Sequence, residues 1–265
     1  MKQIQGKLLW NREVKEGSFV MGVEGDSVYE AATPGQFVMM GVRDLLSPLL
    51  KRPFSIHRVI RNRGAISAIE ILYKVVGEST RLFSKLKSGD EISLLGPLGR
   101  GFSWTPPVGR IVLVGGGIGV APLVFLAESL KASGVDLSCS LGLIGGRRKE
   151  DILCDREMAA LSLPVRISTD NGTLGKKGFV TELLLEALSE GQPEMIYACG
   201  PRAMLKAVSE IAYTHSISCQ LSIETMMACG MGACLACAVP GRKEEGKYRH
   251  ACLDGPVFDA IDVAL

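Results

Sequence analysis

The stretch IVLVGGGIGVAP, residues 111–122, runs from an apolar segment through a glycine-rich turn to a proline. The apolar segment predicts a buried strand, and Pro122 suits the first turn of a following helix. The turn contains four glycines: Gly115, Gly116, Gly117 and Gly119. Because glycine lets the backbone approach a phosphate closely, the stretch indicates a pyrophosphate cradle. It lacks the regular G-x-G-x-x-G pattern, so a purely structural tight turn remains an alternative.

The same alternation of apolar runs and helical patterns continues toward the C-terminus. The segments expected to be helical are 122–132, 156–161, 180–189 and 202–212, and those expected to be strands are 111–114, 137–144, 165–168 and 195–198. Strands that alternate with helices predict a parallel sheet covered by helices. No acidic residue ends the second strand, where Gly145-Gly146-Arg147 occurs instead.

The tripeptide Cys199-Gly200-Pro201 directly follows the fourth strand of this predicted sheet. It is therefore expected at the carboxyl edge, where such folds bind ligands, and Gly200 permits a ligand to approach. Cys199 is the candidate catalytic residue at this edge. A small buried apolar side chain is the alternative interpretation of this cysteine.

The region before residue 103 has a different pattern, in which short β-like runs are separated by Gly, Pro and Asp turns. The clearest runs are 18–23, 36–40, 68–76 and 91–95. Several short strands with turns between them predict a small antiparallel barrel, although a sandwich gives a similar pattern. We therefore expect three parts: a barrel over 1–103, an α/β domain over 108–218 and a loop-rich lobe over 219–265.

Two segments of the predicted barrel carry groups suited to a cofactor. Arg52-Pro53-Phe54-Ser55 combines a cation, a ring and a hydroxyl, which suit a phosphate and a planar group, but an ordinary strand start is an alternative. Gly77-Glu78-Ser79-Thr80 opens a helical stretch whose hydroxyls and backbone N–H groups suit a pyrophosphate. Capping of that helix explains the same residues equally well.

Cysteines in the C-terminal lobe follow the spacing C-x4-C-x2-C-x14-C. They are Cys229, Cys234, Cys237 and Cys252. This spacing indicates ligands of a [2Fe-2S] cluster, and the small residues between the first three let the backbone wrap around inorganic sulfide. A structural zinc site is the alternative, but such sites usually pair two C-x2-C knuckles. The lobe therefore predicts a protein that moves electrons.

Composition sets limits on other function classes. The 30 basic and 28 acidic residues give a formal net charge of +2, which argues against nucleic acid or a membrane recruited by bulk charge. The first ten residues show no secretory signal, and the uncharged stretch 111–127 is interrupted by glycines and Pro122, so it is not expected to span a membrane. A cytoplasmic location is the expectation.

Taken in order, these segments resemble the ferredoxin-reductase superfamily. Its flavin motif R-x-[YF]-[ST] matches Arg52, Phe54 and Ser55, and its nicotinamide half carries G-G-G-x-G-x-A-P and C-G-P turns. With C-G-x-G-x-C-x-x-C and the segment 254–258, the chain is most similar to electron-transfer subunits of heteromeric, NAD-linked dihydroorotate dehydrogenases. The resemblance covers nearly the whole chain.

The resemblance implies which residues bind the cofactors. FAD would contact residues of three barrel segments: Arg52, Pro53, Phe54 and Ser55, then Leu72, Tyr73 and Lys74, and then Gly77, Ser79 and Thr80. The nicotinamide nucleotide would lie over Gly115–Gly119 and Pro122, with Gly200 and Pro201 nearby. Asp170 would repel a 2′-phosphate, so NAD is favoured over NADP. NADP remains the alternative, because Arg147 and Arg148 lie in the neighbouring loop.

A nicotinamide exchanges two electrons at once and a [2Fe-2S] cluster ordinarily one, so flavin, which works in either mode, is the expected intermediary. The resemblance implies a partner subunit that oxidises dihydroorotate at its own FMN in pyrimidine biosynthesis, in a heterotetramer of two chains of each. Alternatives are a reductase subunit for ferredoxin or a hydrogenase, and a zinc-stabilised, non-catalytic binding module.

Overall fold

The computed structural model describes residues 1–42, 48–106, 108–242 and 246–265. Its N-terminal part is a seven-stranded sheet in the order β4-β3-β7-β1-β2-β6-β5, with antiparallel neighbours. The strands are β1 (Lys2–Lys15), β2 (Ser18–Glu24), β3 (Phe37–Val42), β4 (Arg52–Ser55), β5 (Arg58–Asn62), β6 (Ala65–Lys74) and β7 (Glu91–Leu98). The short helices are η1 (Ser27–Tyr29) and α1 (Glu78–Phe83).

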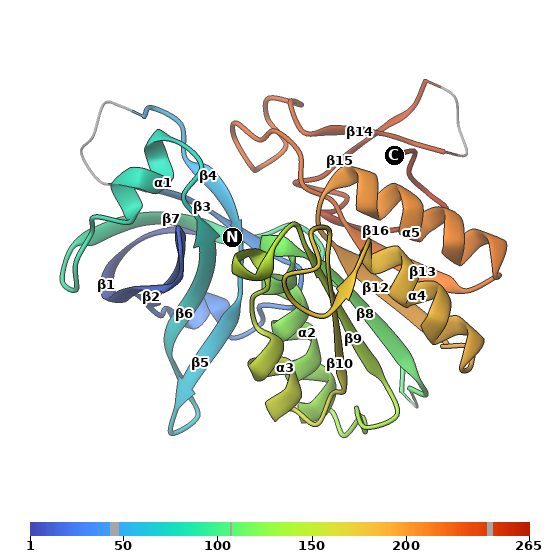
Figure 1. The fold of residues 1–265 in the computed structure, drawn as a ribbon. Helices are drawn as coiled ribbons and strands as arrows, with labels where there is room; N and C mark the ends of the chain where they lie inside the picture. Colours follow the sequence, from blue (N-terminus) through green and yellow to red (C-terminus); the bar gives the residue numbers. More distant parts are fainter. Residues whose placement is uncertain (43–47, 107, 243–245) are drawn as a thin grey trace.

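This sheet is strongly curled, as Figure 1 shows. Phe54 of β4 and Tyr73 of β6 lie far apart in strand order, yet their ring centroids are only 6.2 Å apart. Ile69, Ile71 and Tyr73 occupy alternate positions along β6 and share the buried core that the curled sheet encloses. The predicted antiparallel barrel is confirmed in this form, as a curled sheet around its own apolar core.

The second sheet also has seven strands, in the order β11-β10-β9-β8-β12-β13-β16. All its pairings are parallel except that of β13 with β16. Its strands are β8 (Ile111–Gly116), β9 (Leu141–Gly146), β10 (Val165–Thr169), β11 (Lys176–Lys177), β12 (Met195–Cys199), β13 (Ser218–Ser222) and β16 (Val257–Asp259). The predicted parallel-sheet domain is confirmed.

Helices cover both faces of this sheet. They are η2 (Gly117–Gly119), α2 (Val120–Ala132), η3 (Lys149–Asp151), α3 (Asp155–Ala160), α4 (Val180–Ser189) and α5 (Arg202–Thr214). The helices α2 and α3 lie on the side facing the curled sheet, and α4 and α5 lie on the other (Figure 1). The predicted strand over 137–144 begins later, at Leu141, because residues 137–140 form a hydrogen-bonded turn.

The segment after β13 packs between the two sheets. It contains the paired strands β14 (Ala238–Pro240) and β15 (Tyr248–His250) before β16 joins the second sheet. The expected boundary between the α/β domain and the C-terminal lobe, between residues 218 and 219, falls inside β13. Cys237 and Cys252 share one buried cluster with Met39 of the curled sheet and with residues of the parallel sheet. The C-terminal segment is thus built into the fold rather than simply appended.

Candidate functional site: a glycine turn, a flavin strand and a cysteine loop

The glycine-rich turn lies at the point where the order of the parallel strands reverses. β8 has β9 on one side and β12 on the other, and Gly115 pairs with Cys199. A Cβ on Gly119 would lie 2.4 Å from the Cys199 carbonyl oxygen, so this glycine is needed for contact between the two turns. Gly117 has a φ of +53° and open space where a Cβ would be. Ligands bind at such switch points in open α/β sheets.

The glycines of this turn therefore have separate tasks. A Cβ on Gly116 would lie 2.7 Å from both Met204 Sδ and Pro201 Cδ, so Gly116, like Gly119, permits close packing inside the protein. Of these three glycines, only Gly117 has open space where its Cβ would be, so a ligand can approach its backbone. Pro122 is the third residue of α2 and is buried, consistent with a place in the first helical turn.

Cys199 ends β12 beside this turn, and Gly200 and Pro201 connect it to α5. Desolvation raises the pKa of the Cys199 thiol to about 12, so the thiol stays protonated at neutral pH. A protonated thiol next to the turn can pack or donate a weak hydrogen bond but does not act as a base.

Asp170 follows β10 directly and lies two strands from β8 in the sheet. Its backbone N–H donates to the Gly146 carbonyl oxygen at 3.0 Å, and Asn171 N–H donates to the Arg147 carbonyl oxygen at 3.2 Å. The exposed Asp170 carboxylate is therefore held beside the loop after β9, although the end of β9 itself has no acid. An acidic side chain thus follows β10, whereas β9 ends without one.

The predicted flavin segment Arg52–Ser55 forms β4, at the edge of the curled sheet, and all four residues are half-buried. Arg52 Nη1 donates to the Leu50 carbonyl oxygen at 2.7 Å. The Phe54 ring meets Tyr73 and Phe83 edge-on, with centroids 6.2 and 5.7 Å away. Phe54 thus braces an edge strand whose remaining side chains are available to a planar ligand.

Leu72, Tyr73 and Lys74 end β6 and point to opposite sides, as strand geometry requires. The Tyr73 ring is buried in the core of the curled sheet, and its hydroxyl donates to Asn11 Oδ1 at 3.0 Å. Leu72 packs with the parallel-sheet domain, and Lys74 Nζ donates to Asp151 Oδ1 at 2.6 Å. Contact between a flavin and this segment would therefore depend on the backbone more than on the Tyr73 side chain.

The helix α1 shows how the Gly77–Thr80 segment uses its hydroxyls. Thr80 Oγ1 accepts from the N–H groups of Val76 and Gly77, at 2.9 and 3.0 Å, and donates to the Gly77 carbonyl oxygen. The side chain of Thr80 therefore caps the helix, whereas Ser79 is buried beside it. A Cβ on Gly77 would meet open space, so the bare backbone at this turn is accessible to a ligand.

The four predicted cluster cysteines come together in the C-terminal segment. Cys237 Sγ and Cys252 Sγ are 3.2 Å apart, far longer than a disulfide bond, and all four thiols are free. Cys229 Sγ accepts from the backbone N–H groups of Met231 and Cys234, both at 3.4 Å. Backbone donors aimed at a thiolate are typical of iron–sulfur sites.

Electrostatics differ within this set of thiols. Desolvation opposes ionisation of Cys229, but the N–H groups of Met231 and Cys234 lower its pKa to about 7. Desolvation and the neighbouring Cys237 raise the pKa of Cys252 to about 12. Crowded thiols repel each other as thiolates, and a bound cationic iron centre would remove that repulsion.

The cysteine loop is pressed against the curled sheet. Gly230 has a φ of +71°, and a Cβ there would lie 2.5 Å from Met39 Cγ and 2.9 Å from Met39 Sδ. Met39 is on β3 and pairs directly with Pro53 of β4. One residue therefore separates the loop that begins at Cys229 from the predicted flavin strand, which places the two candidate sites close together.

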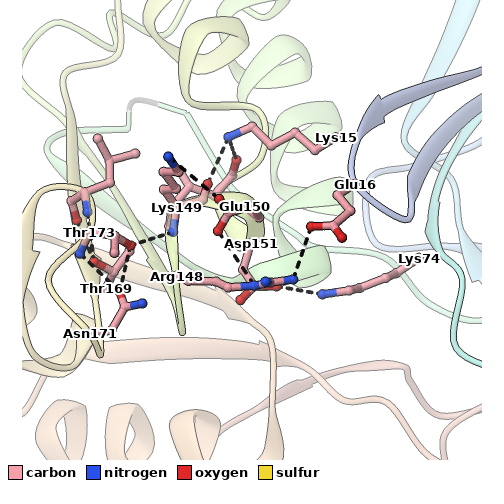
Figure 2. Close-up of polar contacts among 12 residues, drawn as sticks. Lys15, Glu16, Lys74, Arg148, Lys149, Glu150, Asp151, Thr169, Asn171 and Thr173 are labelled. Atoms are coloured by element: carbon pink, nitrogen blue, oxygen red, sulfur yellow. Dashed lines mark hydrogen bonds and ion pairs between the residues drawn. The ribbon is translucent and has the colours of Figure 1, made fainter.

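A polar seam that the sequence did not indicate joins the curled sheet to the loop after β9 (Figure 2). Lys15 Nζ donates to the Lys149 carbonyl oxygen at 3.1 Å, and Arg148 pairs with Glu16 at 3.5 Å. The Lys74–Asp151 bond lies beside them. Apart from Lys74, which belongs to a predicted flavin segment, these residues belong to no motif, and their contacts arise from the packing of the two sheets.

The residues present fit the three cofactors that the sequence predicts. The cysteine loop offers thiols and N–H donors for an iron–sulfur cluster, and the turn at Gly77 beside β4 leaves backbone accessible for FAD. Gly117 leaves room for a dinucleotide at the switch point. Because β6 lies against η2, the flavin and nicotinamide segments face the same junction.

Comparisons with known proteins agree with this arrangement. The family model described as "Iron-sulfur cluster binding domain of dihydroorotate dehydrogenase B" matches residues 224–264, and an "Oxidoreductase NAD-binding domain" matches residues 113–210. The chain is 37% identical over 264 residues to the electron transfer subunit of dihydroorotate dehydrogenase B (NAD(+)) of Desulforamulus reducens, covering 99% of this chain and 98% of that protein. The equivalent subunit of Listeria welshimeri is 39% identical over 269 residues, and the alignment covers 100% of both chains.

Solved structures show the same architecture. A structure of an NADH-dependent reduced ferredoxin–NADP oxidoreductase, described in terms of flavin-based electron bifurcation, has a TM-score of 0.84 and 28% identity, with 98% of this chain and 89% of that chain covered. A Neisseria gonorrhoeae ferredoxin NADP+ reductase with bound FAD and NADP has a TM-score of 0.66 and 19% identity, over 81% and 92% of the two chains, and shares the fold.

The predicted fold class and family resemblance are confirmed, as is the set of an iron–sulfur cluster, FAD and NAD. The individual contacts to these cofactors stay predictions. On its similarity over the full length of the curated relatives, this chain belongs to the family of electron transfer subunits of dihydroorotate dehydrogenase B (NAD(+)).

Proposed function

We propose that this chain transfers electrons between NAD and a separate catalytic subunit that oxidises dihydroorotate, as part of pyrimidine biosynthesis. The observation that carries the proposal is the position of the cysteine loop, one residue away from β4 of the curled sheet. FAD, when bound, accepts electrons in pairs from a nicotinamide or singly from a cluster. The chain's own residues would hold these groups at one junction.

The proposed nicotinamide site is the switch point formed by Gly115–Gly119, Gly200 and Pro201. Its chemistry favours NAD, because a 2′-phosphate placed near the exposed Asp170 would be repelled. Arg148 does not offset this preference, because its guanidinium is already paired with Glu16 and Glu150. Cys199 lies beside the site, where its protonated thiol lines the path of the hydride.

The proposed flavin site is formed by β4, the end of β6 and the turn before α1. Arg52 and Ser55 would contact the cofactor from the edge strand, and the backbone of Leu72–Lys74 would contact it from β6. The N–H groups near Gly77 and Ser79 would hold the pyrophosphate. Thr80 contributes by fixing the shape of that turn, because its hydroxyl is occupied by capping.

The proposed partner surface surrounds the cysteine loop. Three apolar side chains stand exposed there: Met231, Leu235 and Leu253, at 43%, 56% and 50% of their full accessibility. Leu253 packs on the loop itself, since a Cβ on Gly232 would lie 2.4 Å from it. A partner covering these side chains would bring its own flavin, proposed to be FMN, close to the cluster. We propose a heterotetramer with two chains of each kind.

Reconstitution with and without the catalytic subunit tests the division of labour. The chain alone should oxidise NADH with an artificial acceptor, and dihydroorotate-dependent NAD reduction should require both subunits. Dihydroorotate-dependent NAD reduction by the chain alone would refute the proposal. A spectrum without flavin bands and cluster absorbance, in a protein loaded with zinc, would instead favour the non-catalytic binding module.

The docking surface has its own test. Leu253→Asp should abolish co-purification with the catalytic subunit while preserving NADH oxidation by the chain alone. Leu185→Asp is the matched control, because Leu185 is 47% exposed but lies on α4, away from the cysteine loop. Equal co-purification of both variants would rule out this surface.

A second candidate is a reductase subunit serving ferredoxin or a hydrogenase. The observation that favours it is the full-length similarity to the NADH-dependent ferredoxin–NADP oxidoreductase structure. Co-purification from the native cell distinguishes the two, because only the first proposal expects a dihydroorotate-oxidising subunit. We further propose a cytoplasmic location; among the described helices, none has both the length and the apolarity needed to cross a membrane.

A further inference from the structure

A partly buried cluster of side chains of the types that bind metals lies between the curled sheet and the parallel-sheet domain, away from the cysteine loop. His57 comes from the link between β4 and β5, whereas Cys154 and Glu157 come from the start of α3. One ligand atom of each lies within 4.8 Å of the others. His57 is fully buried, and the other two are half-buried. Imidazole, thiolate and carboxylate are the ligands that zinc uses in proteins.

The hydrogen bonding of His57 leaves one ring nitrogen ready to bind a metal. His57 Nδ1 lies 3.0 Å from the Ala121 carbonyl oxygen, which can only accept, so Nδ1 carries the hydrogen. Among the described residues, Nε2 has no hydrogen-bonding partner. Its nearest acid oxygen, Glu157 Oε2, is 3.5 Å away, at the limit of a hydrogen bond. Metal-ligating histidines typically show this tautomer, with the other nitrogen donating to a backbone carbonyl.

The surrounding charges also favour a cation. Arg58 contacts three carboxylates: Glu128 at 2.6 Å, Glu157 at 2.6 Å and Glu70 at 3.5 Å. The charges of three carboxylates therefore converge on one guanidinium at this partly buried junction. Buried charge is costly unless it is compensated. A divalent cation beside Glu157 would add positive charge next to these three acids.

The backbone at Cys154 gives a further sign of constraint. Cys154 adopts a φ of +60°, which is uncommon for a residue with a side chain, at the residue that precedes α3. The Cys154 thiol lies within 4.8 Å of the ligand atoms of His57 and Glu157. Strained residues of this kind cluster at binding sites.

We propose that His57 Nε2, Cys154 Sγ and a Glu157 carboxylate oxygen bind one Zn²⁺ ion that joins the two domains. The thiol releases its proton to solvent on binding, and the histidine binds as the neutral ring. Glu157 can bind the ion and Arg58 together, because its carboxylate offers several lone pairs. A water molecule would complete a tetrahedral site. The inference does not depend on the proposed electron-transfer function.

The test measures zinc in chain whose iron–sulfur cluster is intact, so that the cluster cysteines are not free to take the metal. Zn²⁺ is titrated against a chromophoric chelator, and zinc and iron are counted in the same samples. The test variant is Cys154→Ser, and the matched control is Cys139→Ser, which removes an exposed thiol elsewhere. If Cys154→Ser does not fold, Glu157→Gln on the half-exposed face replaces it.

Wild-type protein and Cys139→Ser should each bind one zinc per chain in addition to the cluster iron. Cys154→Ser should bind zinc at least about tenfold more weakly. Mutating residues that only hydrogen-bond to metal ligands already lowers metal affinity by about 10–100-fold, and this variant loses a ligand itself. Zinc X-ray absorption should show one sulfur near 2.3 Å with nitrogen or oxygen neighbours near 2.0–2.1 Å. No additional zinc in the wild type, unchanged binding by Cys154→Ser, or an all-sulfur shell would each overturn the proposal.

Discussion

Replacing Gly230 with alanine tests how the cysteine loop is held against the curled sheet. The new Cβ would lie 2.5 Å from Met39 Cγ, whereas carbon atoms prefer about 3.5–4.0 Å, so the loop must withdraw by roughly 1 Å or more. The φ of +71° adds a penalty of about 1–2 kcal/mol for a residue with a Cβ. Overpacking in a buried contact costs typically about 1–3 kcal/mol more.

We therefore expect Gly230→Ala to lower the free energy of unfolding by about 2–5 kcal/mol. Gly246→Ala is the matched control, because Gly246 has a similar φ of +79° but open space where its Cβ would be. It should cost only the backbone penalty of about 1–2 kcal/mol. Iron content and denaturant unfolding of both variants measure the difference.

Electron transfer provides the functional measurement. In anaerobic stopped-flow experiments with NADH, Gly230→Ala should reduce the flavin at the wild-type rate but reduce the cluster more slowly, because only the loop has moved. The double variant with Met39→Ala removes the atoms that the new Cβ meets. If Gly230→Ala is as costly in that background as in the wild type, the contact with Met39 is not the cause and the reasoning is refuted.

Three further outcomes are expected. Gly119→Ala should lower thermal stability by pushing apart the two turns at the switch point. Gly117→Ala should cost only the backbone penalty of about 1–2 kcal/mol for its positive φ and should raise the KM for NADH; equal effects in thermal melts and kinetics would contradict the separate tasks of these glycines. Cys252→Ser should lose the cluster absorbance and iron while keeping flavin, measured by visible spectroscopy and iron analysis. Burial raises the pKa of Asp151, but the hydrogen bond and charge of Lys74 lower it further, so the pKa lies below its ordinary value. The pair therefore stabilises the fold fully above the ordinary carboxyl pKa, and this stabilisation is lost as the pH falls through the lowered pKa. Asp151→Asn should thus destabilise at pH 7, by up to about 1 kcal/mol for a partly exposed pair, and much less in acid; a cost independent of pH would contradict this.

Local patterns were sufficient for four strands of the parallel sheet and the helices between them, but not for β11, β13 and β16. The predicted helix over 180–189 matches α4, and the strand at 165–168 differs from β10 by one residue. These segments are apolar runs with clear boundaries, so their periodicity is visible without tertiary contacts. β1 was not identified as a strand, because one side of this 14-residue strand is solvent-exposed and its sequence is mostly polar.

Placement of side chains required the fold. The sequence grouped Leu72, Tyr73 and Lys74 as one segment, but strand alternation sends Tyr73 into the core and Lys74 to Asp151. Thr80 had two equally suited roles, and the hydrogen bonds of its hydroxyl assign its side chain to capping. Neither outcome is encoded in a local motif.

By itself, the sequence determined the glycine turn, the cysteine spacing and the order of the parts, because each depends on residues that are near one another along the chain. The tertiary structure alone decided which glycine meets protein and which meets open space, and that Gly230 lies against Met39. It also brought His57 to Cys154. Such contacts join residues about 80 to 190 positions apart, and they follow from tertiary packing rather than from any local pattern.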